Sequence, residues 1–340
     1  MHVSPETAFA PLTIPDAAKA RLSIMLIAKH AKWQGGQHAD DGNHAPYHVE
    51  IREALAALGL HVLLSDTFED LFDKPDIDFV FPLLNRAGFF NSEMLAPLLC
   101  TRHGLPYLGA SPIIRGLSDD KHLTKLAAAQ AGLPTAPWAV FRRDVAVDLA
   151  RCPDADRYVV KPNNSSASWG VRDATDRTGV GEAVAQLHGE GHDAIVEPFL
   201  SGNDVEVSLI TVDGTPRILP LMVFEQDDPT HLRTYSEKRA LDNTKQGYIL
   251  RAYDDDAEIV ARIKDMTRRL WGEFHPFDYG RFEFRVDPET GTVNFIEVNL
   301  NCNLSSTKTI ATAARLIGWT HSQLIETVLA ESLDRQGLLA

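Results

Sequence analysis

The chain has 340 residues, 44% hydrophobic and 24% charged, with a formal net charge of −14 at pH 7. This length predicts two or three folded domains. The negative charge argues against nucleic acid and anionic membranes as main partners, so small molecules are the expected partners.

The cysteine pattern and the hydropathy pattern indicate where the protein works. The three cysteines, Cys100, Cys152 and Cys302, show no CxxC spacing, which argues against a disulfide framework and a structural zinc site. No stretch approaches a membrane span, and residues 1–20 lack the basic-then-apolar order of a signal peptide. We expect a cytoplasmic protein with a flexible leader at residues 1–20.

The N-terminal region alternates predicted strands and helices. Residues 29–48 are rich in Gly, His, Asp and Asn, so they predict a loop, and a helix that ends at Gly59 should follow. The helix-Gly-strand junctions LGLHVLL, HGLPYLG and AGLPTAPWAVF favour a parallel α/β layer. The other expected elements are strands at 22–27, 61–64 and 79–83 and a helix at 92–103.

Further along, the chain predicts a second region of mixed structure. Ser118 is a candidate N-cap for a helix that runs to Ala131. The run AIVEPFLSGNDVEVSLITVDG predicts strands separated by SGN and an antiparallel turn at Asp213-Gly214. The other expected features are a strand at 157–162, helices near 181–189, 256–273 and 320–333, and a flexible polar loop at 221–246.

Two strand-like runs, YGRFEFRV and VNFIEVN, flank the turn sequence DPETG. Each run alternates apolar and polar residues, as a strand with one apolar face does. In the second run, Ile296 and Val298 are the expected apolar face. Matching the apolar faces predicts that Glu283 lies opposite Glu297, because a one-residue slip would bury the polar set.

The same register places Arg281 opposite Asn299. Two facing carboxylates, Glu283 and Glu297, repel each other and therefore call for a cation. Oxygen ligands favour Mg²⁺. The alternative is an exposed hairpin whose carboxylates are solvated and partly offset by Arg281 and Arg285.

Lys161 ends a predicted apolar strand and precedes a loop of Asn and Ser. A single lysine in this place is often a surface residue. The serine-rich loop to Gly170 and the acids Glu197, Asp204 and Glu206 favour a site for an anionic ligand instead.

The segments DDKHLTK, VVKPNNSSASWG, IVEPFLSGNDVEV, GRFEF and FIEVNLN occur in an order that resembles the ATP-grasp superfamily and, within it, the D-alanine–D-alanine ligase branch. The resemblance extends from about Phe79 to the C-terminus. It implies the α/β ATP-grasp fold. The expected parts are an N-terminal parallel α/β domain (21–115), a small α+β lid domain (116–200) and a C-terminal α+β catalytic domain (201–340).

The resemblance also implies ATP as cofactor, with Mg²⁺ as the metal ion and Mn²⁺ as its alternative. The residues that match ATP-binding positions are the phosphate-binding lysines Lys121 and Lys161, the lid-loop residues Ser165, Ser166 and Ser168, the adenine-hinge residues Glu197, Phe199 and Leu200, and the ribose-binding Asp204.

Five more residues match positions that act on the reacting groups. Glu283, Glu297 and Asn299 match the metal ligands, and Arg281 matches the arginine that steadies the acyl-phosphate. Lys238 matches the lysine of a mobile loop over the γ-phosphate. The implied reaction activates a carboxylate as an acyl-phosphate, from which an amine displaces phosphate.

The departures from the branch fall where donor and acceptor substrates bind. The N-terminal glycine-rich segment is replaced by HAKWQGGQHADDGNHAPYHVE. These departures predict a carboxylate–amine ligase for a substrate other than D-alanine, in a specialised biosynthetic pathway. The residues that replace the branch's substrate positions are Asn85, Arg86, Asn301, Cys302, Asn303, Lys308 and Thr309.

Several alternatives stay open at this point. The chain could be a D-alanine–D-alanine ligase with unusual pocket residues, or a nucleotide-binding module without turnover, although the retained lysines and metal ligands argue against the module. Arg86 or Lys308 would pair with an extra substrate carboxylate, unless both are ordinary surface cations. The partners implied by the resemblance are small-molecule carboxylates and amines, and a second copy in a homodimer.

The histidine-rich loop admits two interpretations. A metal site would use histidines and acids, but their irregular spacing favours a solvated or substrate-covering loop. Cys302, without an evident base, is interpreted as packing or pocket lining rather than as a nucleophile. The loop residues concerned are His30, His38, Asp40, Asp41, His44 and His48.

Overall fold

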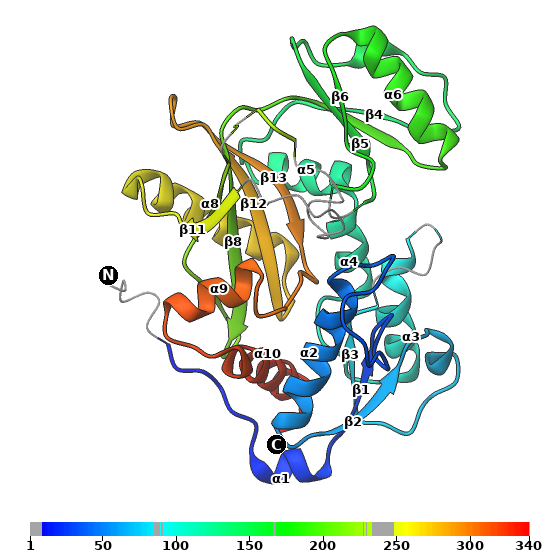
Figure 1. The fold of residues 1–340 in the computed structure, drawn as a ribbon, viewed down its shortest axis with the longest axis vertical. Helices are drawn as coiled ribbons and strands as arrows, with labels where there is room; N and C mark the ends of the chain where they lie inside the picture. Colours follow the sequence, from blue (N-terminus) through cyan, green and yellow to red (C-terminus); the bar gives the residue numbers. More distant parts are fainter. Residues whose placement is uncertain are drawn as a thin grey trace.

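The computed structural model describes residues 9–84, 89, 91–165, 168–226, 228, 230–232 and 248–339. Figure 1 shows an N-terminal part, a smaller lid above it, and a C-terminal sheet beside both. Within the described residues no helix has the length and apolar character needed to cross a membrane. The predictions for Asn85, Arg86, Ser166 and Lys238 lie outside the described residues.

The N-terminal part contains a parallel sheet in the order β2-β1-β3, which confirms the predicted parallel layer. The helix after the loop begins at His44, inside the stretch predicted to be a loop, because Ala45, Tyr47 and His48 are buried and extend its packed face. The elements are β1 (Ser23–Ile27), α2 (His44–Ala57), β2 (His61–Ser65), η2 (Glu69–Leu71), β3 (Phe79–Pro82), η3 (Ser92–Met94), α3 (Leu95–His103) and α4 (Pro112–Asp119).

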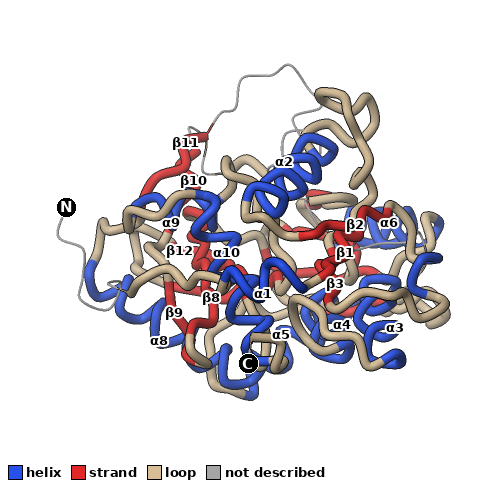
Figure 2. The backbone as a smooth tube through the Cα atoms, turned by 90° about the horizontal axis from the view of Figure 1, so that it is seen from below, coloured by secondary structure: helices blue, strands red, loops and turns tan. Residues whose placement is uncertain are grey.

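The chain before β1 is packed, which corrects the expectation of a flexible leader for residues 9–20. Helix α1 (Asp16–Arg21) lies beside the C-terminal helix α10 (His321–Arg335), as Figure 2 shows. The Ile14 amide donates to Glu326 Oε1 at 3.1 Å, and Lys19 Nζ lies 2.8 Å from the same oxygen. Ile14 is buried, so hydrophobic packing holds this segment in place as well.

The lid is an antiparallel sheet in the order β4-β7-β5-β6, covered by helix α6. Its own core begins at Ala139. Helix α5 (Lys121–Gln130) precedes it in sequence but packs on the C-terminal sheet through Ala128. The lid elements are β4 (Ala139–Phe141), η4 (Leu149–Arg151), β5 (Tyr158–Pro162), β6 (Arg172–Ala174), α6 (Arg177–Gly189) and β7 (Ala194–Pro198).

Two local predictions are wrong in this region. The predicted single helix is two helices, because Asp120 is extended and caps α5 by accepting the Leu123 amide at 2.9 Å. Ser118 lies in the last turn of α4 and donates to the Arg115 carbonyl, so it is no N-cap. The predicted strands on either side of SGN are both present, and they belong to different sheets.

The C-terminal sheet has the order β11-β10-β8-β12-β13, with β9 beside β8. The predicted turn at Asp213-Gly214 joins β8 to β9 and is confirmed. Part of the predicted loop at 221–246 is strand β10. The elements are β8 (Asn203–Val212), β9 (Thr215–Ile218), β10 (Met222–Gln226), β11 (Tyr248–Ala252), α8 (Ala257–Phe274), β12 (Tyr279–Val286), β13 (Val293–Asn299) and α9 (Thr309–Leu316).

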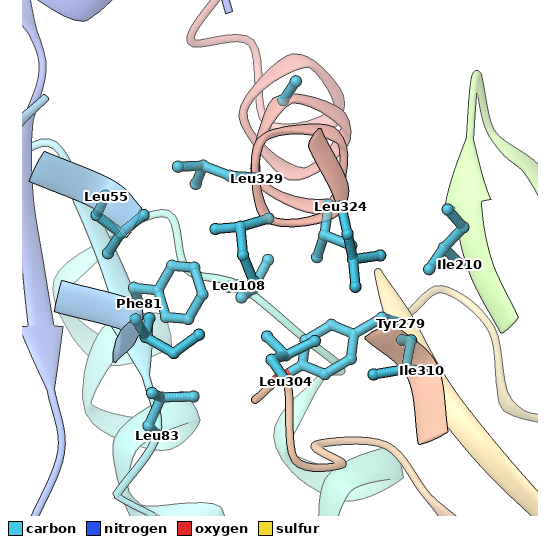
Figure 3. Close-up of a cluster of buried hydrophobic side chains, with 14 of the residues drawn as sticks. Leu55, Phe81, Leu83, Leu108, Ile210, Tyr279, Leu304, Ile310, Leu324 and Leu329 are labelled. Atoms are coloured by element: carbon cyan, nitrogen blue, oxygen red, sulfur yellow. The ribbon is translucent and has the colours of Figure 1, made fainter. Parts of the chain in front are cut away.

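One hydrophobic core joins the N-terminal part to the C-terminal sheet. In Figure 3, Leu55 and Phe81 of the N-terminal part lie toward Leu329 of α10. Tyr279 and Ile210 of the C-terminal sheet lie toward Leu324 of the same helix. Helix α10 therefore fills the space between the two parts, which limits their relative movement.

Asp278 provides the polar counterpart of this packing. Its side chain is fully buried and accepts from the Gly109 amide at 2.6 Å, Ser332 Oγ at 2.8 Å and Arg335 Nη2 at 2.9 Å. We expect Asp278→Ala to lower the free energy of unfolding by about 3 to 5 kcal/mol, because three donors lose their shared acceptor. Urea unfolding measures the loss.

The matched control is Asp265→Ala on the exposed face of α8, where Arg269 Nη1 lies 3.9 Å from the carboxylate. Its unfolding free energy should change by less than about 0.5 kcal/mol. A similar small change for the Asp278 variant would contradict a structural role for that carboxylate.

Candidate active site

A cleft lies between the lid and the C-terminal sheet. Its walls come from α5, β5, the loop after β5, the β7–β8 connection and the β12–β13 hairpin. The sequence-predicted residues that line it are Lys121, Lys161, Ser165, Ser168, Glu197, Phe199, Leu200, Asp204, Glu283 and Glu297. These positions come from segments far apart in sequence, so their convergence is a property of the fold.

The β12–β13 hairpin has the predicted register. Glu283 pairs with Glu297, and Arg281 pairs with Asn299, which confirms both predicted pairs. Asn299 Nδ2 lies between the two carboxylates, 3.0 Å from Glu283 Oε1 and 3.3 Å from Glu297 Oε1. Three oxygen-bearing side chains therefore converge on one point.

A β-bulge changes the register immediately after Glu283. Beyond it, Phe284 pairs with Phe295, and both Phe295 and Val298 are buried in the core. Ile296 lines the cleft instead. The predicted apolar face of Ile296 with Val298 is therefore wrong, because the extra residue of a bulge reverses the alternation.

The converging side chains fit a hard divalent cation. All their ligand atoms are oxygen, and the amide of Asn299 presents Oδ1 to the carboxylates once it rotates about its last bond. Lys121 Nζ is 3.6 Å from Glu297 Oε2 and donates to the Ser165 carbonyl at 2.6 Å. Cationic and anionic groups thus alternate along this wall of the cleft.

Arg281 is held by two carboxylates. Its Nη2 donates to Glu283 Oε1, and its Nε lies 3.3 Å from Glu206 Oε2. Burial by itself lowers the pKa of Arg281, but Glu206 and Glu283 raise it above its usual value. Thr309 Oγ1 donates to Glu206, which links Arg281 to the start of α9.

Glu197 is a buried carboxylate shared by two lysines. Lys125 Nζ lies 2.5 Å from Oε1 and Lys161 Nζ lies 2.5 Å from Oε2. Burial raises the pKa of Glu197, but the two lysines lower it to about 2. Sequence reasoning missed Lys125, although its spacing of four from Lys121 places both lysines on one helix face.

The hinge after β7 is supported by two arginines. The Arg157 guanidinium lies 4.0 Å from the Phe199 ring centroid. Arg285 donates to Asp204 Oδ1 at 2.6 Å and to the Leu200 carbonyl at 3.0 Å. Sequence reasoning also missed that Arg285 holds the hinge. The feature that could have predicted this role is the position of Arg285 on the polar face of β12.

The segment 301–309 lies outside the cleft lining. Tyr279 donates its hydroxyl hydrogen to Asn301 Oδ1, and Asn303 Oδ1 accepts the Ser305 amide at 2.8 Å. Lys308 is half-buried and directly precedes α9. Cys302 is buried and its pKa is raised to about 12 by burial, which favours the interpretation as packing.

The histidine-rich loop brings His30, His38 and Asp41 within 4.8 Å of one another. His38 Nδ1 accepts backbone amides of Asp40 and Asp41, so Nε2 carries the proton and has no lone pair for a metal. Lys29 Nζ lies 2.5 Å from Asp41 Oδ2. These contacts favour a hydrogen-bonded loop over a metal site.

The three-part architecture and the cleft between lid and sheet define an ATP-grasp enzyme, an ATP-dependent ligase that forms C–N bonds. The chain belongs to the D-alanine–D-alanine ligase family, because the family's sequence model, described as D-ala D-ala ligase C-terminus, matches residues 127–330.

Individual relatives agree with this family. The chain is 26% identical to a D-alanine–D-alanine ligase of Polaromonas sp. (strain JS666 / ATCC BAA-500), over 94% of this chain and 96% of the relative. It is 25% identical to a D-alanine–D-alanine ligase of Synechococcus sp. (strain JA-3-3Ab), over 93% and 95% of the two chains.

Solved structures show the same fold. The D-alanine–D-alanine ligase from Bacillus anthracis complexed with ATP superimposes with a TM-score of 0.72 at 18% identity, over 93% of this chain and 98% of that chain. D-alanyl-alanine synthetase A from Vibrio cholerae gives a TM-score of 0.73 at 17% identity, over 92% and 98%. The predicted α/β ATP-grasp fold is confirmed.

Proposed function

We propose that this protein is a D-alanine–D-alanine ligase that uses ATP to join two D-alanine molecules. The observation that carries the chemistry is the convergence of Lys121 and Lys161 with Glu283, Glu297 and Asn299 around one cleft. The ligases of Polaromonas and Synechococcus support D-alanine as substrate better than the sequence departures support another one.

In this proposal the cleft holds ATP between lid and sheet. Lys121 and Lys161 face the phosphates, and Asp204 binds the ribose hydroxyls. Glu283, Glu297 and Asn299 would hold Mg²⁺, which neutralises phosphate charge when bound. The residues present fit that ion because each offers oxygen and the two carboxylates need a counter-charge.

The reaction then proceeds in two displacements. The carboxylate oxygen of the first D-alanine attacks the γ-phosphorus, ADP leaves, and an acyl-phosphate results. The amine of the second D-alanine attacks the acyl carbon and phosphate leaves, while the ammonium proton passes to solvent or a base. Arg281, preset by Glu206 and Glu283, stabilises the negative charge that develops on the acyl oxygen.

A second candidate function is ligation of another amino acid. The observation that favours it is the segment after the third metal-ligand candidate, Asn299, where Asn301, Cys302 and Asn303 depart from the branch. The hydrogen bond from Tyr279 to Asn301 and the burial of Cys302 indicate that this segment has its own packing. A different acceptor would follow if that packing reshapes the second substrate pocket.

A panel of amino-acid pairs decides between the two candidates. With ATP and Mg²⁺, we expect D-alanine alone to support phosphate release, with D-alanyl-D-alanine as the product by mass. L-alanine, tested in parallel, should give at most about one hundredth of that rate, because a misplaced reacting amine loses the benefit of orientation. Turnover that requires another pair, with none from D-alanine, would overturn the first candidate.

The proposal also covers the domain boundaries, the compartment and the assembly. We propose a central lid domain at 116–200. Helix α5 lies within these bounds but packs on the catalytic sheet, and the core of the lid itself begins at Ala139. The proposed site of action is the cytoplasm, and the proposed assembly is a homodimer. Size-exclusion chromatography with light scattering tests the assembly.

A further inference from the structure

Lys125 is a fully buried lysine behind the wall of the cleft. Its Nζ donates to Thr135 Oγ1 at 2.6 Å and lies 2.5 Å from Glu197 Oε1. The third side of the ammonium group faces the ring of Trp138, with 5.3 Å to the centroid. A buried charge with three such partners is held in one place.

Glu197 connects this buried lysine to the cleft. Its other oxygen lies 2.5 Å from Nζ of Lys161, whose side chain is 12% exposed and lines the cleft. Lys125 is not part of the lining. The buried carboxylate of Glu197 therefore lies between Lys161, which can reach a ligand in the cleft, and Lys125, which cannot.

This arrangement matters when an anionic ligand enters the cleft. If Lys161 turns toward a phosphate, its ion pair with Glu197 weakens. The pKa of Glu197 is lowered to about 2, so the carboxylate is ionised at neutral pH and needs another cation. A buried carboxylate with no partner is strongly unfavourable, and Lys125 is the cation that remains.

We propose that Lys125 is a positioning residue for ATP, which acts through Glu197 and thereby frees Lys161 to hold the nucleotide phosphates. The inference rests on the proposed function in one respect, the binding of ATP in this cleft. Removing Lys125 leaves Glu197 paired with Lys161 alone, and Lys161 then has to leave a buried carboxylate uncompensated in order to bind ATP.

The anchor of Lys125 reaches the metal-ligand strand. Thr135 Oγ1 donates to the Phe295 carbonyl at 2.8 Å, and the Phe295 amide donates to the Pro134 carbonyl at 2.8 Å. Phe295 lies at the β-bulge, two residues before Glu297. The position of Lys125 is therefore set by the same strand that carries the candidate metal ligands.

Calorimetric titration with ATP, without amino acid, tests this inference. We expect Lys125→Met, a neutral side chain of similar length, to raise the Kd for ATP about tenfold. Lys32→Met is the control, because Lys32 is an exposed lysine paired with Asp66 on the N-terminal part. Its Kd should stay within about twofold of the wild-type value.

The double variant Lys125→Met with Glu197→Gln distinguishes positioning from a structural role. Without the carboxylate, Lys161 has no counter-ion to leave. Because Glu197 also matches an adenine-hinge position, the reference is the single variant Glu197→Gln, and adding Lys125→Met to it should change the Kd for ATP by less than about twofold. If the loss of ATP affinity in the double variant equals the sum of the losses in Lys125→Met and Glu197→Gln, the inference is overturned. If Lys125→Met does not fold, Thr135→Val keeps the charge but removes one contact to Nζ, and we expect its Kd to rise about threefold.

The outcomes separate this inference from the proposed function. Failure of the wild-type protein to bind ATP would overturn the proposed function and the inference with it. ATP binding by the wild type together with an unchanged Kd in both Lys125→Met and Thr135→Val would overturn the inference alone. The KM for D-alanine should change less than the KM for ATP, because Lys125 acts through Glu197 on Lys161, the lysine proposed to hold the nucleotide phosphates.

Discussion

Replacing Glu297 with glutamine is expected to lower Mg²⁺-dependent phosphate release by at least about 100-fold while the fold stays intact. The substitution keeps the shape of the side chain but removes one of two facing negative charges. Glu283 and Asn299 would remain as metal ligands, and Lys121 would lose an anionic neighbour 3.6 Å away. We therefore expect the variant to bind Mg²⁺ more weakly and to hold the phosphates of ATP less accurately.

Steady-state phosphate release over a range of Mg²⁺ concentrations measures this effect, with thermal unfolding as the check on folding. Glu289→Gln is the matched control, because Glu289 lies in the exposed turn of the same hairpin. Its activity should equal that of the wild type. Unchanged activity and unchanged Mg²⁺ dependence in Glu297→Gln would refute the metal assignment.

The second large effect is expected from Arg281→Met, with kcat about 100-fold to 1,000-fold lower and a smaller change in the KM for ATP. Arg281 is the cation between Glu206 and Glu283. In the proposed mechanism it stabilises charge that develops only after the carboxylate is activated. Losing such an interaction lowers kcat rather than ground-state binding.

Rapid-quench measurement of ADP and of dipeptide formation separates the two displacements for this variant. The control is Arg251→Met on β11, where the arginine forms exposed ion pairs with Glu225 and Asp255 away from the cleft. Arg251→Met should retain full activity. An increase in the KM for ATP with unchanged kcat in Arg281→Met would instead indicate a role in nucleotide binding.

The segment 301–309 is held by contacts with a part of the chain that is distant in sequence. Glu50 of α2 accepts the Ser306 amide at 3.1 Å, and Tyr47 accepts the Leu304 amide at 3.2 Å. Through these bonds the N-terminal part holds the segment 301–309 in place. If this segment binds a substrate, as the second candidate function proposes, helix α2 contributes to its position through these two hydrogen bonds.

The candidate site could be predicted well where its signal was local. Alternation of polar and apolar residues was enough to pair Glu283 with Glu297, because side chains of a strand alternate between two faces. The same reasoning failed two residues away at Ile296, because a bulge inserts one residue without a marked change in composition. Sequence reasoning also missed Asp120 as the N-cap of α5. Residue type does not separate Asp120 from Ser118, because both are good capping residues.

The order of motifs along the chain was sufficient for the ATP-grasp fold and for ten of the residues that line the cleft, because each motif combines a short strand or helix with the polar residues at its end. Their roles toward ATP stay a prediction. Tertiary structure alone decided that Lys125 and Lys161 share Glu197, and that residues 9–20 pack on α10. These contacts join segments that are distant in sequence. A buried charge can choose among several partners, and only the folded arrangement determines which of them lies within reach.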